Sequence, residues 1–275
     1  MLKGKIAVIT GGGGVLCSAF AKELAKRGVK VALLDINKEA AGITAAEINS
    51  AGGEAIAVGA DVLNAESLAK ARQEVNSVLG KADILINGAG GNSPKGTTTK
   101  ETFSIKDLDD KEIVTFFDLA PENVNRLFNL NFTGTFLTTQ AFAKDMADRS
   151  GVILNISSMS AFSPMTKVPV YSAAKAAISN FTMWLAVHFA KAGIRVNALA
   201  PGFFDTNQNH KLLFNDDGTP TERTSKILSN TPLGRLGVTD DLTGTLVYLL
   251  DNEMSGYVTG AVIPVDGGFQ AYSGV

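Results

Sequence analysis

Short apolar runs alternate with longer amphipathic segments along the whole chain. The runs lie at residues 5–10, 30–34, 54–60, 84–87, 151–156, 195–200 and 261–265, and several lack polar alternation, as expected for strands buried on both faces. Helical patterns fill residues 15–27, 38–50, 64–78, 121–148, 170–192 and 240–250. This alternation predicts a parallel sheet of about seven strands with right-handed crossovers and helices on both faces. The fold class is therefore α/β, a doubly wound sheet in a single domain.

Two long polar segments, residues 91–120 and 203–231, interrupt this rhythm. Each shows little periodicity, and each follows the carboxyl end of a predicted strand. Long irregular segments in a compact fold are commonly functional, and ligands of open α/β sheets bind at the carboxyl ends of strands. We predict that both segments are substrate loops inserted into one domain that spans residues 1–275.

Composition narrows the class of protein. The chain has 275 residues, a net charge of −2 and a pI near 5.8, so overall charge predicts no attraction to nucleic acid or to an anionic membrane. Its single cysteine, Cys17, excludes an internal disulfide and fits a reducing compartment. The apolar runs are too short to span a membrane, and the first residues lack a signal-peptide pattern. We expect a cytoplasmic protein.

A glycine-rich turn follows the first predicted strand, in the sequence TGGGGVLCSAF (residues 10–20). Such turns between a strand and a helix bind phosphate through backbone amides at the helix N-terminus. Asp35 ends the second strand, where a carboxylate can bind an adenosine ribose and repel a 2′-phosphate. The pair predicts an NAD site in preference to NADP. The residues expected to touch the cofactor here are Gly11, Gly13, Gly14, Val15, Leu16 and Asp35.

A second constellation contains Ser158, Tyr171 and Lys175. Tyr171 and Lys175 are four residues apart in a predicted helix, so they share one face. A neighbouring ammonium favours the phenolate and lowers a tyrosine pKa from its ordinary value near 10. We therefore expect Tyr171 to exchange a proton with a carbonyl or alcohol oxygen and Ser158 to hydrogen-bond the same oxygen.

These motifs resemble the short-chain dehydrogenase/reductase family over nearly the whole chain. The matching pieces are the TG of residues 10–11, NGAG at 87–90, Ser158 placed 13 residues before the YxxxK of YSAAK, PG at 201–202 and VDGG at 265–268. Three positions depart from the family pattern. Val15 and Cys17 replace its second and third glycines, and Gly88 replaces an asparagine. None of these departures removes a reacting group.

The resemblance implies a Rossmann-type fold, NAD as cofactor and a homotetramer. It implies that Lys175 also holds the nicotinamide ribose and that Asn131 is a fourth catalytic residue, which supports a proton-relaying water. Further cofactor contacts carried over from the family are Asp61, Val62, Asn87, Gly88, Ala89, Gly90, Tyr171, Pro201, Gly202 and Thr206.

The substrate is expected between the two polar loops. A steroid or acyl chain would need a more apolar lining, whereas the side chains here suit a hydroxyl-rich anion. The pieces GNSPK, FFDLAPENV and NLNFTGT resemble the branch of the family that acts on sugar acids, which implies interconversion of D-fructuronate and D-mannonate. Lys95 is predicted to pair with the substrate carboxylate. The full set of substrate candidates is Asn92, Lys95, Ser158, Gln208 and His210.

Other functions remain open at this point. A reductase of the same fold could act on another keto-sugar, a polyol or an acyl-thioester. A nucleotide-binding regulator without catalysis would be expected to lose one of Asn131, Ser158, Tyr171 and Lys175, yet all four are present. No cluster has metal-ligand spacing, so no metal is expected.

Overall fold

The computed structural model describes residues 2–206 and 209–274. Its centre is one sheet of seven parallel strands in the order β3-β2-β1-β4-β5-β6-β7, which confirms the predicted doubly wound α/β fold. Strand order reverses between β1 and β4, the place where such sheets bind ligands. The strands are β1 (Ile6–Thr10), β2 (Lys30–Asp35), β3 (Glu54–Gly59), β4 (Ile84–Asn87), β5 (Val152–Ile156), β6 (Arg195–Pro201) and β7 (Val262–Val265).

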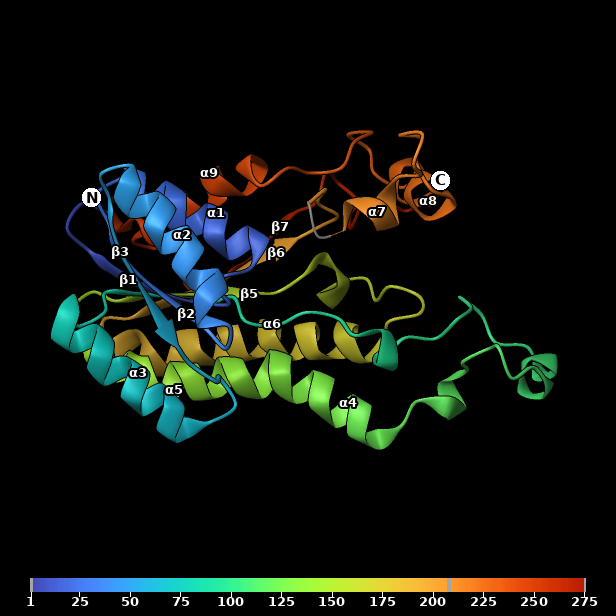
Figure 1. Cartoon of the computed structure of the whole chain (residues 1–275), viewed down its shortest axis with the longest axis horizontal. Coiled ribbons are helices and arrows are strands. Elements are labelled where there is room, and N and C mark those ends of the chain that lie inside the picture. The colour runs from blue at the N-terminus through green and yellow to red at the C-terminus, as the bar shows by residue number, and fades with distance from the viewer. Residues whose placement is uncertain (1, 207–208, 275) are drawn as a thin grey trace.

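Helices cover both faces of the sheet (Figure 1). One layer contains α1 (Val15–Lys26), α2 (Lys38–Ser50), α9 (Asp240–Leu250) and the short α10 (Asn252–Ser255). The other contains α3 (Ala65–Val78), α4 (Pro121–Phe128), α5 (Gly134–Met146) and α6 (Pro169–Phe189). Side chains alternate along β1, so Ile9 packs with Phe20 of α1 while Val8 packs with Phe142 of α5, in two separate cores. Among the described residues, none of the helices has the length and apolarity needed to cross a bilayer.

The predicted helix over residues 121–148 is interrupted. It consists of α4 (Pro121–Phe128), a π-helical turn (Asn129–Thr133) and α5 (Gly134–Met146). Helical structure is therefore confirmed over residues 121–146, with a π turn inside it whose extra residue hydrophobic spacing does not reveal. Such turns are frequent at functional sites, and this one contains Asn131.

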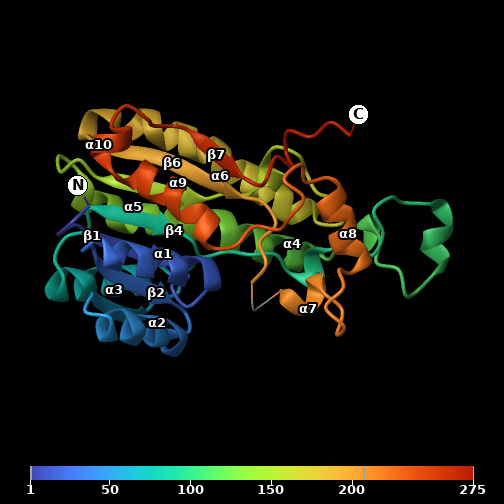
Figure 2. The same cartoon turned by 90° about the horizontal axis from the view of Figure 1, so that it is seen from above.

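The two polar insertions differ from each other. Residues 91–120 contain only short 3₁₀ turns, Pro94–Gly96, Ile105–Asp109 and Phe116–Asp118, and they project from the body of the molecule (Figures 1 and 2). Residues 203–231 instead form two helices, α7 (His210–Leu213) and α8 (Glu222–Ser229). Irregular structure is therefore the wrong prediction for α8. Its start is fixed by Thr221, whose side chain accepts a hydrogen bond from the Thr224 amide.

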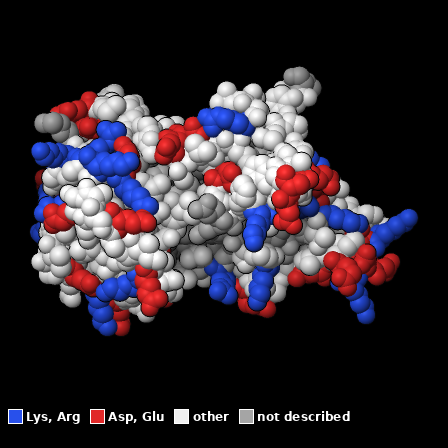
Figure 3. Space-filling view, turned by 45° about the horizontal axis from the view of Figure 1, so that its top comes forward, with Lys and Arg blue, Asp and Glu red and all other residues white. Residues whose placement is uncertain are grey.

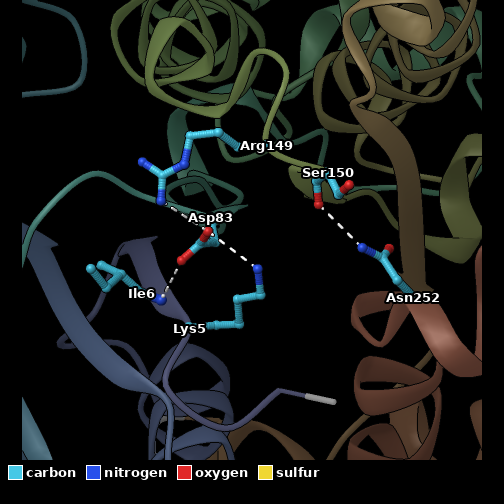
Figure 4. A network of polar contacts seen from close by, with 6 residues as sticks. All are labelled: Lys5, Ile6, Asp83, Arg149, Ser150 and Asn252. Carbon is cyan, nitrogen blue, oxygen red and sulfur yellow. Dashed lines mark hydrogen bonds and ion pairs between the residues drawn. The ribbon is translucent and has the colours of Figure 1, made fainter.

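The amino ends of the strands are tied together by a buried carboxylate (Figure 4). Asp83 accepts a hydrogen bond from the Ile6 amide at 3.0 Å and forms ion pairs with Lys5 at 3.4 Å and Arg149 at 3.2 Å. These contacts join the starts of β1, β4 and β5. They lie at the edge of the sheet opposite the glycine-rich turn. This amino edge therefore stabilises the sheet, whereas the carboxyl edge is the one available to ligands.

Candidate active site

A cavity of about 580 Å³ lies at the carboxyl edge of the sheet. It will be called the first cavity. Fifteen of the predicted cofactor residues line it: Gly11, Gly14, Val15, Leu16, Asp35, Asp61, Val62, Gly88, Ala89, Gly90, Tyr171, Lys175, Pro201, Gly202 and Thr206. Ser158 lines it as well. The fold therefore gathers residues from the ends of six strands around one space.

The run of four glycines is explained by close packing. A Cβ atom on Gly12 would lie 2.8 Å from the Leu33 side chain, and one on Gly13 would lie 2.7 Å from that of Ala40. Gly11 has φ +68°, a conformation that favours glycine. Gly13 turns away from the first cavity, and its amide donates to Asp35. Its predicted cofactor contact is therefore corrected to a supporting role.

Cys17 and Gly88 form a matched pair. A Cβ atom on Gly88 would overlap the Cys17 sulfur and would also lie 2.8 Å from the Thr10 carbonyl oxygen. At position 88 this chain has glycine where the family has asparagine. The side chain of Cys17, which stands where the family has glycine, fills the space that this leaves. Burial raises the pKa of the Cys17 thiol to about 12, so it remains protonated and acts as a packing residue.

Asp35 links the glycine turn to the start of α2. One carboxylate oxygen accepts from the Gly13 amide at 3.0 Å, and the other accepts from the Asn37 amide at 2.9 Å. The helix cap itself is Asn37, whose side chain accepts from the Ala40 amide. Since Asp35 also lines the first cavity, its carboxylate is held in place with capacity left for a ligand hydroxyl.

This arrangement predicts the cofactor preference of an Asp35→Asn variant. The amide keeps an oxygen that can accept the Gly13 hydrogen bond but loses the charge that repels a 2′-phosphate. The ratio of kcat/KM for NADPH to that for NADH should rise on the order of 10- to 100-fold. Initial rates with each cofactor measure it, and an unchanged ratio would show that Asp35 does not select the cofactor.

Asn87 is buried behind the first cavity and does not line it. Its side-chain amide donates to Thr139 of α5 at 3.0 Å and to Asn155 of β5 at 2.8 Å. The predicted cofactor contact is therefore wrong for this side chain, because β4 carries it into the interior. The turn that follows is held by Thr10, whose hydroxyl accepts from the Gly88 and Ala89 amides, both at 3.1 Å.

Ser158, Tyr171 and Lys175 meet in the first cavity. The Lys175 ammonium donates to the Ile156 carbonyl oxygen at 2.8 Å and lies 5.6 Å from the centroid of the Tyr171 ring. The Ser158 oxygen accepts hydrogen bonds from the amide and hydroxyl of Ser160, at 3.2 and 3.0 Å. Ser160, which the motif spacing does not single out, therefore orients Ser158 and leaves the Ser158 proton available to donate.

The pKa of Tyr171 differs from the expectation. Burial raises it, and a hydrogen bond with Ser158 works in the opposite direction. The prediction of a lowered value is wrong because desolvation of the phenolate is the largest effect, while the Lys175 ammonium donates its hydrogen bond to the Ile156 carbonyl oxygen. Burial lowers the pKa of Lys175 to about 8, so the ammonium is charged at neutral pH at an energetic cost.

A Lys175→Met variant should consequently be more stable than the wild type at pH 7, by roughly 1–3 kcal/mol. The folded-state pKa of Lys175 near 8 lies below the ordinary lysine value of 10.5, which holds in the unfolded chain. Below pH 8 the folded and the unfolded wild type both hold the Lys175 proton, so the stability difference between the variant and the wild type is constant. Between pH 8 and 10.5 the unfolded wild type keeps the Lys175 proton and the folded wild type has lost it. The free energy of unfolding of the wild type therefore rises with pH, and the stability advantage of Lys175→Met shrinks. Urea denaturation from pH 6 to 10 measures this, and a pH-independent difference would contradict it.

Asn131 is fully buried and holds the turn after β4. Its amide nitrogen donates to the carbonyl oxygens of Leu127 and Gly91, both at 2.9 Å, and its oxygen accepts from the Gly91 amide at 3.1 Å. A Cβ atom on Gly90 would lie 2.6 Å from that oxygen and 3.5 Å from the Lys175 nitrogen. The π turn thus places Asn131 behind the Gly90 and Gly91 turn and close to Lys175, outside the lining of the first cavity. Its catalytic role stays a prediction.

A second cavity, also about 580 Å³, adjoins the projecting segment and α8. Asn92 lines it, but Lys95 and His210 are exposed and line neither cavity. The His210 ring contacts the Asp205 carboxylate at 3.0 Å. Gln208 lies outside the described residues. The second cavity is lined by Asn92, Thr97, Glu101, Ser163, Pro164, Met165, Thr166, Lys167, Val168, Phe203, Glu222, Arg223, Lys226, Ile227, Asn230 and Phe269.

Comparison with known proteins identifies the family. The family model described as short chain dehydrogenase matches residues 5–216, which include both the glycine turn and the Ser158, Tyr171 and Lys175 set. The chain belongs to the short-chain dehydrogenase family. Two relatives, both named only as uncharacterised oxidoreductases, share 54% identity (Haemophilus influenzae; 100% of this chain, 96% of the relative) and 55% identity (Bacillus subtilis; 100% and 98%).

A solved structure from the same family is nearly superimposable. It is a crystal structure of a Haemophilus influenzae protein, provisionally named D-mannonate oxidoreductase, with bound NAD. It shares 53% identity and a TM-score of 0.96, and the match covers 100% of this chain and 98% of that one. The chain is thus an NAD-dependent short-chain oxidoreductase that acts on CH–OH groups.

The first cavity fits NAD(H) on its own chemistry. Gly14 caps α1 without a side-chain hydrogen bond, and the first turn of α1 carries no acidic residue. The amides at this helix start are therefore free to bind the pyrophosphate, while Asp35 at the end of β2 faces the same space.

Proposed function

We propose that this protein reduces the ketone of a sugar acid with NADH, most specifically D-fructuronate to D-mannonate, and catalyses the reverse oxidation. The observation that supports it best is the lining of the second cavity, which includes three cationic side chains, two carboxylates and several hydroxyl and amide groups. An anionic, hydroxyl-rich substrate suits such a wall. The provisional name of the Haemophilus influenzae structure points to the same substrate class.

Tyr171 is the proposed proton donor. Burial keeps its hydroxyl protonated near neutral pH, so it is ready to donate to a ketone oxygen as reduction proceeds. Ser158 donates a second hydrogen bond to the same oxygen, since its own oxygen is already engaged by Ser160. Lys175 then supports the phenolate, and a water held beside Asn131 returns the proton. NAD(H), when bound, supplies the hydride in reduction and accepts it in oxidation.

The cofactor contacts follow the lining of the first cavity. We propose that the amides of Val15 and Leu16 bind the pyrophosphate beside Gly14, whose own amide donates to the Gly11 carbonyl oxygen at 2.9 Å. Asp35 binds the adenosine ribose, and Asp61 and Val62 contact the adenine. Gly88, Ala89 and Gly90 allow close backbone approach, and Thr206 with Pro201 and Gly202 meets the nicotinamide end. Val15 adds a side chain to the turn, so the pyrophosphate should sit slightly farther from it than in relatives with glycine there.

A substrate panel tests this function. Purified protein is mixed with NADH or NADPH and with sugar-acid ketones, neutral ketoses or acyl-thioesters, and cofactor oxidation is followed at 340 nm. Strong preference for NADH and for sugar acids is expected. Equal or higher kcat/KM for a neutral ketose or an acyl-thioester would favour the alternative reductases. Cofactor binding without turnover on any class would favour a regulator.

In addition to this activity, we propose that the protein forms a homotetramer. Aromatic side chains stack along α5 and α6, with Phe136 on Phe181, Phe181 on Trp184, and Trp184 on His188. Trp184 remains 56% exposed, which is unusual for a large aromatic side chain unless a partner covers it. Light scattering should give the mass of four chains, and a monomer at micromolar concentration would contradict this proposal.

A further inference from the structure

The second cavity and the first cavity are lined by neighbouring residues of the same chain segments. Three segments contribute to both cavities: Gly91 lines the first and Asn92 the second, Gly202 and Phe204 flank Phe203, and Val168 precedes Tyr171 by three residues at the start of α6. The two cavities therefore share three stretches of chain, and the second cavity offers space for the remaining carbon atoms of a substrate whose ketone lies at Tyr171.

The charges around the second cavity are unequal. Glu101 and Glu222 both pair with Lys226, at 3.2 and 3.6 Å. The other two cations of the wall, Arg223 and Lys167, have no acidic partner among residues 2–206 and 209–274. On the face drawn in Figure 3, basic and acidic side chains are intermixed. Arg223 and Lys167 are both exposed residues that line the same polar cavity, an arrangement that suits an anionic ligand.

The backbone supports the same assignment. Lys167 has φ +66°, a left-handed conformation that is costly for a residue other than glycine. It is held there by hydrogen bonds from the Thr98 amide to the Lys167 carbonyl at 2.8 Å and from the Val168 amide to the Thr166 carbonyl at 2.9 Å. The projecting segment thus fixes Lys167 at the cavity wall, while α8 presents Arg223 one position after Glu222.

We propose that Arg223, assisted by Lys167, binds the carboxylate of the substrate and so selects sugar acids over neutral sugars. This inference rests on the proposed function. A guanidinium can hold both carboxylate oxygens at once, and in a keto-sugar acid the carboxylate is separated from the ketone by carbon atoms that carry hydroxyls. Lys95, the sequence-based candidate for this role, lies outside both cavities.

Kinetics of Arg223→Gln and Lys167→Gln test the assignment, each with a six-carbon keto-sugar acid and with the matching neutral ketohexose. For Arg223→Gln, KM for the acid should rise roughly 10- to 100-fold with little change in kcat, because binding in the ground and transition states is lost equally. Lys167→Gln should show a smaller rise. Kinetics with the neutral sugar and the Kd for NADH should not change, and Arg223→Lys should restore part of the affinity.

Arg27→Gln is the matched control. Arg27 is an exposed arginine at the amino edge of the sheet and pairs with Glu23 of the preceding helix at 2.9 Å, so its loss should leave KM unchanged. If the wild type reduces sugar acids and Arg223→Gln has wild-type KM, the inference is overturned while the proposed function stands. If Lys95→Gln alone raises KM, the carboxylate binds elsewhere. If the wild type reduces no sugar acid, both the function and this inference fail.

Discussion

Tyr171→Phe should lower kcat by roughly 10³-fold or more, at the upper end of the range for a lost general acid. The substitution removes one oxygen atom from a half-buried ring and leaves the ring that packs beside Lys175. Folding and cofactor binding should therefore be preserved. Steady-state turnover gives the loss in rate, and the Kd for NADH from fluorescence titration shows that the first cavity is intact.

The pH dependence adds a second readout. Because burial raises the Tyr171 pKa, the wild type should keep its proton for ketone reduction through neutral pH and reduce faster there than it oxidises at saturating substrate. The small residual rate of Tyr171→Phe should no longer follow this titration. Wild-type turnover in Tyr171→Phe would mean that another group donates the proton.

Gly88→Asn, which introduces the residue of the family pattern, should destabilise this protein by about 3 kcal/mol or more. Its Cβ would overlap the Cys17 sulfur, and forced overpacking typically costs 1–3 kcal/mol and occasionally more. The turn that it displaces also lines the first cavity, so NADH binding should weaken with stability. Urea denaturation and NADH titration measure the two effects.

The double variant Cys17→Gly with Gly88→Asn should recover much of this loss. Removing the sulfur leaves room for the new side chain, although the Thr10 carbonyl oxygen at 2.8 Å keeps the rescue incomplete. Cys17→Gly alone is the control, and it should destabilise by opening a small void. The double-mutant cycle of these variants should give a coupling energy above about 1 kcal/mol between positions 17 and 88. Additive effects would show that the two departures from the family pattern are independent.

Much of the site was predictable because its geometry is local. Tyr171 and Lys175 are one helical turn apart, and the ends of parallel strands meet at one edge of a sheet whatever the details of packing. Hence the glycine turn, Asp35, Ser158 and the later motifs converge on the first cavity as expected.

The rest depends on contacts between distant segments. The glycine turn and the family pattern predicted cofactor contacts for Gly13 and Asn87. The Gly13 amide instead donates to Asp35, and the Asn87 side chain is buried and donates to Thr139. The π turn at Asn131 has no hydrophobic signature. Burial of Tyr171, which reverses its expected pKa shift, is a property of the assembled cavity.

The proposed carboxylate-binding residue, Arg223, could not be predicted from the sequence for the same reason. It sits in a segment with little periodicity, and only the fold brings α8 against Lys167 and the loop after β4. The cap at Thr221 and the Glu222–Lys226 pair at i,i+4 are the signals that would have revealed α8 in advance.

The central claim is that this chain transfers a hydride between NAD(H) and the keto carbon of a sugar acid. The most direct measurement supplies the wild-type protein with D-fructuronate and NADH deuterated at C4 of the nicotinamide, and examines the product by NMR and mass spectrometry. The account predicts D-mannonate with one deuterium at the new alcohol carbon, formed in step with NADH oxidation. NADH left unoxidised with D-fructuronate, under conditions where a neutral ketose or an acyl-thioester is reduced, would contradict it.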